Sequence, residues 1–181
     1  MLMSHSKGAM KGFTLMELMI TLSVAAILLG LAAPSFVDIL KNTRLSTQMN
    51  NLASAINFTR SEAIKRGLPA TICSSNDNLS CGGTWQDGWL IFSDADGDSV
   101  VDAADDDEVI RVGDGLSAND MTLSFGARTH ITYQADGFSS GGDNGTIRFC
   151  DSRGDAYAKG LIVSLSGRVR TAPDGGILNC P

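Results

Sequence analysis

The feature that most constrains this chain is an apolar segment near its N-terminus. Between Gly12 and Val37 the only charged residue is Glu17, and the uncharged run that starts at Leu18 is 20 residues long. As a helix, that run measures ~30 Å, which matches the hydrocarbon core of a bilayer. The segment therefore predicts a membrane-spanning helix with a carboxylate at its edge.

Three kinds of N-terminal segment fit such a run, and they differ in what they require of Glu17. A secretory signal has a shorter apolar region of roughly 7–15 residues, followed by a small-residue cleavage site. The apolar run here is longer than that, and the small residues near its end, Ala32 and Ala33, are followed by Pro34, which argues against such a cleavage site. A plain membrane anchor has no use for a carboxylate, which costs roughly 2.5–3.5 kcal/mol at the bilayer centre. In the third kind, a short leader is removed in front of the helix and Glu17 gains a partner.

A cut between Gly12 and Phe13 would supply that partner as a new α-amino group, one helical turn from Glu17. The stretch "GFTLMEL" resembles the class III signal of type IV prepilins. In that signal a short basic leader ends in glycine, an aromatic residue opens the mature chain, and glutamate is its fifth residue. The resemblance implies a leader of residues 1–12, methylation of the new amine, and a retained transmembrane and filament-core helix over residues 13–36.

Beyond the apolar segment the sequence predicts a helix and then a β-rich head. Apolar residues recur at helical spacing over residues 37–67, so this segment should be an amphipathic helix that continues into the head. They are Leu45, Met49, Leu52, Ile56 and Ala63. Residues 68–181 contain eight short strand-like segments separated by Gly, Asn, Asp and Ser, which predict an antiparallel, β-sandwich-like head of two packed sheets. The predicted fold class is therefore α+β.

This order of elements, together with "TRSEAIKRG", "DGWLIFSDADGD" and "SLSGRVR", resembles the GspH/FimT type of minor pilins and pseudopilins over nearly the whole chain. The resemblance implies a non-enzymatic subunit without a cofactor. Its partners would be a prepilin peptidase and other major or minor pilins or pseudopilins. It would sit in the bacterial inner membrane as a single-pass protein with a periplasmic head, and then in a filament. Our first hypothesis is a minor pilin of a type IV pilus, and the alternative is a minor pseudopilin of a type II secretion system.

The four cysteines all follow the apolar segment, and none forms a CxxC pair. An even number at wide spacing after an export-type N-terminus favours two disulfides over a zinc site, with reduced buried thiols as the alternative. Four cysteines allow three pairings. We favour Cys73–Cys81 as a small loop closure and Cys150–Cys180 as a clamp on the C-terminus.

The net charge of −6 is concentrated in one segment, Asp94–Glu108, which contains seven Asp and one Glu and no basic residue. Four of these carboxylates are spaced so that their oxygens could converge on one Ca²⁺; they are Asp94, Asp96, Asp98 and Asp102. The positions of glycine and of the last acidic residue depart from the EF-hand pattern. We therefore favour a solvated acidic hairpin and predict no metal.

The stretch "GFSSG" around Ser139 matches the G-x-S-x-G pattern of a hydrolase nucleophile. Neither histidine of the chain, His5 nor His130, follows Ser139 as that arrangement requires. A flexible loop therefore explains the pattern better than an anchored hydrolase.

The stretch "SGRVRT" carries the strongest signal for a ligand in the head. Arg168 and Arg170 alternate around Val169, so on a strand or hairpin edge both guanidinium groups project to one face. From Arg148 to the C-terminus basic residues outnumber acidic ones, and the guanidinium fork suits phosphate without sequence preference. The G-R-x-R arrangement also resembles the motif of FimT-like minor pilins that bind DNA during natural transformation. DNA capture is thus a second predicted role, and an ordinary solvated strand edge is its alternative.

Overall fold

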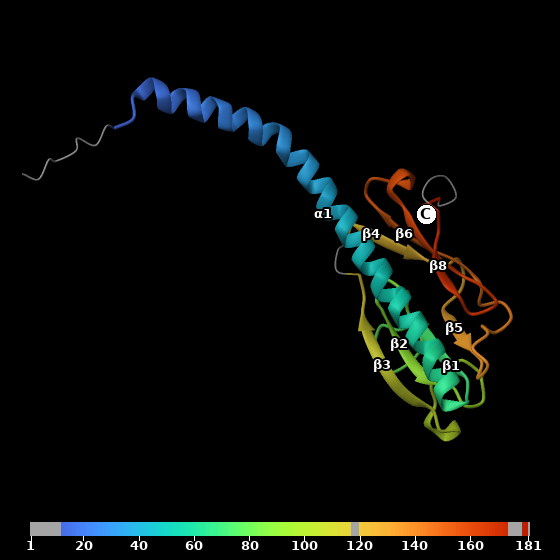
Figure 1. Ribbon diagram of the computed structural model, residues 1–181. Helices are drawn as coiled ribbons and strands as arrows, with labels where there is room; N and C mark the ends of the chain where they lie inside the picture. Colours follow the sequence, from blue (N-terminus) through green and yellow to red (C-terminus); the bar gives the residue numbers. More distant parts are fainter. Residues whose placement is uncertain (1–11, 117–119, 174–178, 181) are drawn as a thin grey trace, which may run out of the picture. The chain divides into compact units, whose positions relative to one another are not determined.

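The computed structural model of the chain describes residues 12–116, 120–173 and 179–180, apart from the side chains of residues 31–34 and 103 (Figure 1). All of the predicted leader except Gly12 therefore lies outside the described residues. One long helix comes first, and short strands make up most of the regular structure after it. These elements are α1 (Leu15–Arg66), β1 (Ala70–Ser74), β2 (Gly88–Ser93), η1 (Ala103–Asp105), β3 (Glu108–Asp114), β4 (Met121–Ser124), β5 (His130–Tyr133), β6 (Gly145–Asp151), η2 (Asp155–Tyr157), β7 (Lys159–Val163) and β8 (Val169–Thr171).

The chain divides into two compact units, Met1–Leu40 and Lys41–Pro181. The first unit contains the apolar part of α1, and its large apolar side chains are exposed wherever they are described, Phe13 at 79% and Leu29 at 69%. By length and composition, α1 is the one helix among the described residues that could cross a membrane. None of the described residues of the first unit covers this apolar surface, so it can face lipid or other helices.

The second unit contains two four-stranded antiparallel sheets. Their strand orders are β3-β2-β1-β5 and β4-β6-β7-β8. Each of the eight strand-like segments seen in the sequence forms one of these strands. This order puts β3 and β5 at the edges of the first sheet, and β4 and β8 at the edges of the second. The α+β prediction, with a long helix followed by antiparallel sheets, is confirmed.

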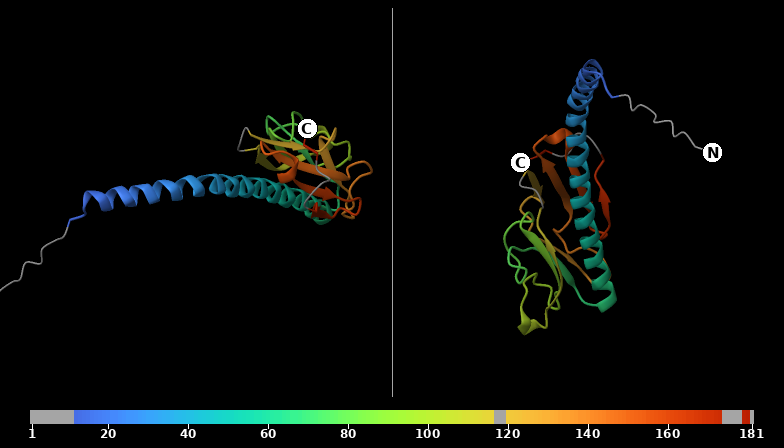
Figure 2. Two further views of the ribbon diagram at one scale, coloured as in Figure 1. Left: turned by 90° about the horizontal axis from the view of Figure 1, so that it is seen from above. Right: turned by 90° about the vertical axis from the view of Figure 1, so that its left-hand side faces the viewer.

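The core of the head lies between α1 and the inner faces of both sheets. The predicted stripe of five apolar residues on the helix is buried, and Leu45, Ile56 and Ala63 have no exposed surface. Ile72, Ile91 and Ile131 of the first sheet belong to the same cluster, as do Ile147, Phe149 and Leu161 of the second. Two views of the head show α1 running along one side of both sheets (Figure 2). The apolar stripe thus stabilises the head's own fold.

Each disulfide lies on the outer face of one sheet. Cys73 is bonded to Cys81 and packs with Leu90 and Phe92, and Cys150 is bonded to Cys180 near Ala158 and Ala172. This is the pairing favoured from the sequence. The second bond attaches Cys180 to β6. The backbone N–H of Cys180 also donates to Asp155 of η2, 2.7 Å away.

Candidate functional site

The first turn of α1 is built around Thr14. The Oγ1 atom of Thr14 accepts a hydrogen bond from the backbone N–H of Glu17 at 3.2 Å, and the Thr14 carbonyl accepts from Leu18 at 3.1 Å. Thr14 is therefore the N-cap, and Glu17 occupies the third position of the helix. A carboxylate there also interacts favourably with the helix dipole. Sequence analysis missed the cap, although T-x-x-E before an apolar run is the sequence signature of a capping box.

The three residues of the predicted processing site thus lie together at one helix end. Gly12 and Phe13 precede the cap in an exposed segment without regular secondary structure, and Glu17 is exposed one turn later. The Glu17 carboxylate forms no hydrogen bond or salt bridge with the described residues, so it is available to a partner outside this turn. The geometry is compatible with an α-amino group at Phe13 or with one from a neighbouring chain.

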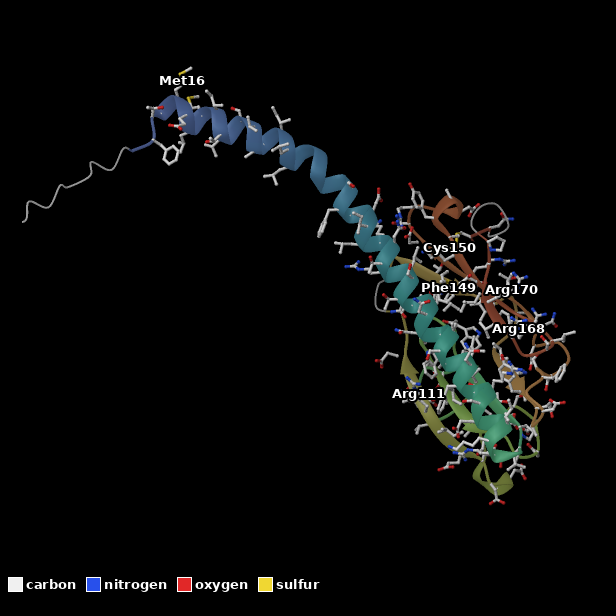
Figure 3. All side chains as sticks on the ribbon, viewed as in Figure 1. Met16, Arg111, Phe149, Cys150, Arg168 and Arg170 are labelled. Carbon is white, nitrogen blue, oxygen red and sulfur yellow. A yellow bond between two sulfur atoms is a disulfide. The ribbon has the colours of Figure 1, made fainter. Side chains whose placement is uncertain are left out.

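Arg168 and Arg170 lie at the free edge of the second sheet. Val169 starts β8 and packs against the core, whereas both arginines beside it are exposed (Figure 3). Arg170 pairs with Ile162 of β7, and Arg168 closes the turn between the two strands, since its carbonyl accepts from the Ser164 N–H at 3.0 Å. Both arginines are thus exposed on either side of the half-buried Val169, Arg170 on β8 and Arg168 in the turn before it.

The wider basic patch expected near the C-terminus is only partly formed, because two of its members face the helix. Arg153 forms a salt bridge with Asp151 at 2.6 Å and donates to Asn42 of α1. Lys159 donates to Ser46 at 2.8 Å. Burial would raise the pKa of Asp151, but the hydrogen bonds from Arg153 outweigh it and hold that pKa below its usual range. These cations fix the sheet to α1, which leaves Arg168 and Arg170 as the exposed pair.

The acidic segment folds as a hairpin whose carboxylates accept hydrogen bonds from its own backbone. Asp94 is buried and accepts from Thr71 and from the Ser99 N–H, and burial raises its pKa. Its carboxylate oxygens lie within 4.8 Å of those of Asp96 and Asp98. Asp102, the fourth residue of the calcium hypothesis, instead caps η1 by accepting from Ala104 and Asp105. The structure therefore brings together three of the four residues of the calcium hypothesis and places Asp102 in a separate cap.

Ser139 has a structural role in the described residues. Its hydroxyl donates to the Ser164 carbonyl at 3.1 Å, and its backbone N–H donates to the Leu165 carbonyl at 3.1 Å. The imidazole of His130 lies near Asp143, at 3.8 Å. The G-x-S-x-G stretch therefore joins the β7–β8 turn to the loop after β5, and in the part of the chain that the structure describes Ser139 is not paired with a histidine.

A capped, uncovered apolar helix that continues into the core of a head with two antiparallel sheets defines a pilin-like protein. A family model described as "Type II transport protein GspH" matches residues 48–167, and the chain belongs to this family. A model of the prokaryotic N-terminal methylation motif matches residues 8–33. These matches confirm the GspH/FimT-type minor pilin resemblance and identify a minor pilin or pseudopilin.

Two solved structures of the type IV minor pilin FimU of Pseudomonas aeruginosa (strain PAO1) are similar to this chain. For one crystal form, sequence identity is 22% over 74% of this chain and 91% of that chain, with a TM-score of 0.57. For the other, identity is 22% over 71% and 92%, with a TM-score of 0.53. At this identity the likeness shows a shared fold. The comparison with curated proteins gave no match.

Proposed function

We propose that the chain is a minor pilin of a type IV pilus, cleaved after Gly12 and inserted by α1 into the filament or its tip complex. The main support for this proposal is the capped start and the exposed apolar surface of the N-terminal half of α1. It begins directly after Phe13 with a side-chain cap at Thr14, and the apolar side chains described there are not covered by any described residue of the same unit. Such a surface needs lipid before assembly and other apolar helices after it.

Glu17 gives this assembly its register. In a filament core of packed helices, an uncompensated carboxylate is costly, whereas a carboxylate paired with a cationic α-amino group is not. Cleavage creates that amine at Phe13, and the methylation motif over residues 8–33 supports the same processing. Each subunit would then present one amine and one carboxylate. Two neighbouring pilins would then align along the filament axis so that the amine of one pairs with the carboxylate of the other.

The alternative machine is a type II secretion system, to which the family description refers. The two are distinguished by deleting the gene and measuring surface pili and secreted proteins in the same cells. The proposal predicts fewer pili, recovery of the chain in sheared pilus fractions, and normal secretion. Loss of secretion with normal piliation would instead identify the chain as a pseudopilin of the secretion system.

DNA capture is a second candidate function, favoured by the exposure of Arg168 and Arg170 at the edge of β8. Contacts from two guanidinium groups to phosphate give weak binding without sequence preference. The acidic hairpin would repel the same ligand, so DNA would approach the β8 edge. This role is independent of the filament role, because it depends on the charge of the head and not on Gly12 or Glu17.

The test compares DNA binding of the full chain in nonionic detergent with that of Arg168→Gln and Arg170→Gln. Glutamine keeps much of the side-chain length and removes the charge. Each lost phosphate contact should flatten the salt dependence by about one unit of slope. Arg44→Gln is the matched control, since it removes one exposed arginine from α1. No retention by the parent at low salt, or equal effects of all three substitutions, would remove the DNA role.

A further inference from the structure

The turn that carries Arg168 is held from three sides. We call residues 164–168 the arginine turn. It joins β7 to β8 and projects from the end of the second sheet, yet it makes hydrogen bonds with α1, with β5 and with the loop after β5. A turn at a sheet edge is commonly mobile. These contacts therefore require an explanation beyond the closing of a hairpin.

The contact with α1 is made by Arg60. Its Nε atom donates to the Gly137 carbonyl at 2.9 Å, and its Nη2 atom donates to the Ser166 carbonyl at 3.3 Å. One guanidinium group thus bridges the loop after β5 and the centre of the arginine turn. The planar fork of arginine is suited to two acceptors held in fixed positions, and the hydrogen bonds are strengthened by its charge.

Two further side chains complete the attachment. The hydroxyl of Tyr133 on β5 donates to the Gly167 carbonyl at 3.3 Å, and Ser139 bonds the carbonyls of Ser164 and Leu165. Four consecutive carbonyls of the turn, from Ser164 to Gly167, therefore accept from other parts of the head.

Gly167 makes this close packing possible. Its φ is +75°, and a Cβ atom there would lie 2.0 Å from the Gly137 carbonyl oxygen and 3.0 Å from Arg60 Nε. Any side chain would separate the turn from the loop and from Arg60. Gly167 is therefore needed for the close contact with Gly137 and Arg60.

We infer that Arg60 is a positioning residue for the Arg168 and Arg170 pair: it fixes the arginine turn to α1, so that the two guanidinium groups are presented already ordered to a polyanion. The inference rests on the proposed DNA role of the head. Arg60 itself is half-buried, and two of its donors are used by backbone carbonyls. Its cation acts through the turn, and phosphate contact belongs to Arg168 and Arg170.

The experiment compares Arg60→Lys with the parent, using the full chain in nonionic detergent and two measurements. The first is amide hydrogen exchange in peptides covering the arginine turn and residues 134–140. The second is affinity for duplex DNA as a function of salt. Lysine keeps the charge but cannot reproduce the two-acceptor fork. Arg66→Gln is the control, because Arg66 lies on the same helix and pairs with Glu62 and Glu108 instead of the turn.

For Arg60→Lys we expect exchange in the arginine turn to be faster by about tenfold, because a charge-assisted bond to the backbone is lost. Affinity for DNA should fall by about three- to tenfold, since side chains that were ordered in advance must now be ordered on binding. The salt slope should stay at the parent value, because the same phosphate contacts form. The control should match the parent in exchange.

The possible failures are distinguishable. Unchanged exchange in Arg60→Lys overturns the attachment itself, whatever DNA does. Faster exchange with unchanged DNA affinity overturns the positioning role and leaves the arginine pair as a binding site. A reduced salt slope makes Arg60 a phosphate contact. A parent chain that does not bind DNA removes the proposed DNA role and the positioning inference with it.

Discussion

Removal of the Cys150–Cys180 disulfide should lower the stability of the head mainly by freeing the unfolded chain. The bond joins residues 30 positions apart. Loop-closure entropy for a loop of this length corresponds to about 3.5–4 kcal/mol at 25 °C. Cys150 is buried and Cys180 is half-buried, so removal of the pair also costs some native packing. The double variant Cys150→Ala, Cys180→Ala should therefore lose at least this free energy of unfolding and expose more surface on unfolding.

The other disulfide provides the comparison. Cys73 and Cys81 are 8 positions apart, for which the same relation gives about 2.5 kcal/mol. Cys73 is fully buried against Leu90 and Phe92 and Cys81 is half-buried, so removal of this pair costs native packing as well. The Cys73–Cys81 variant should therefore lose about 1 kcal/mol less than the Cys150–Cys180 variant, which is the difference in loop-closure entropy. Only the Cys150–Cys180 variant should show a clearly larger denaturant slope, because its longer loop restrains the unfolded chain more.

A suitable assay is urea unfolding of a fragment that begins at Lys41, followed by tryptophan fluorescence. All three hydrophobic clusters lie within this fragment, and both tryptophans, Trp85 and Trp89, are largely buried in it. A loss below about 1 kcal/mol with an unchanged slope would refute the loop-closure reasoning.

Three further outcomes follow from the same structure. Glu17→Ala should leave cleavage intact but reduce the amount of the chain in sheared pili, since a neighbour's amine is left unpaired; normal incorporation would contradict the pairing. Ile56→Ala should lower the free energy of unfolding by about 2–5 kcal/mol, because the side chain is fully buried between α1 and both sheets. Burial raises the pKa of Asp143, whose carboxylate accepts from the Thr132 N–H at 2.8 Å. The protonated Asp143 therefore stabilises the parent at low pH, and this stabilisation is lost as pH rises above the unfolded pKa of about 3.9 and through the raised folded pKa. Asp143→Asn does not titrate, so in urea titrations its free energy of unfolding should rise relative to that of the parent between about pH 4 and 7.

Local patterns in the sequence predicted a large part of this molecule. The apolar run, the eight strand-like segments and the stripe from Leu45 to Ala63 each follow from the spacing of residues along the chain. For that reason the order of elements could be read before the structure. The exposure of Arg168 and Arg170 follows in the same way, since alternation around a partly buried Val169 is a property of three consecutive residues.

Contacts between distant residues could not be read in this way. Counting charges placed Arg153 and Lys159 in a basic surface, but both bind polar groups of α1 that are more than 100 positions away. Arg60 is similarly separated from the turn it holds. Asp94 is buried after the end of β2, where it accepts a hydrogen bond from Thr71 of β1. In each case the partner is chosen by the packing of α1 and the sheets, which no local spacing encodes.

Mass spectrometry of the mature N-terminus, after purification of the chain from its native membrane, shows whether the chain is processed as a pilin. The first peptide should begin at Phe13 and carry a methyl group on its α-amine. An intact Met1, or an N-terminus beyond the apolar run of α1, would contradict it.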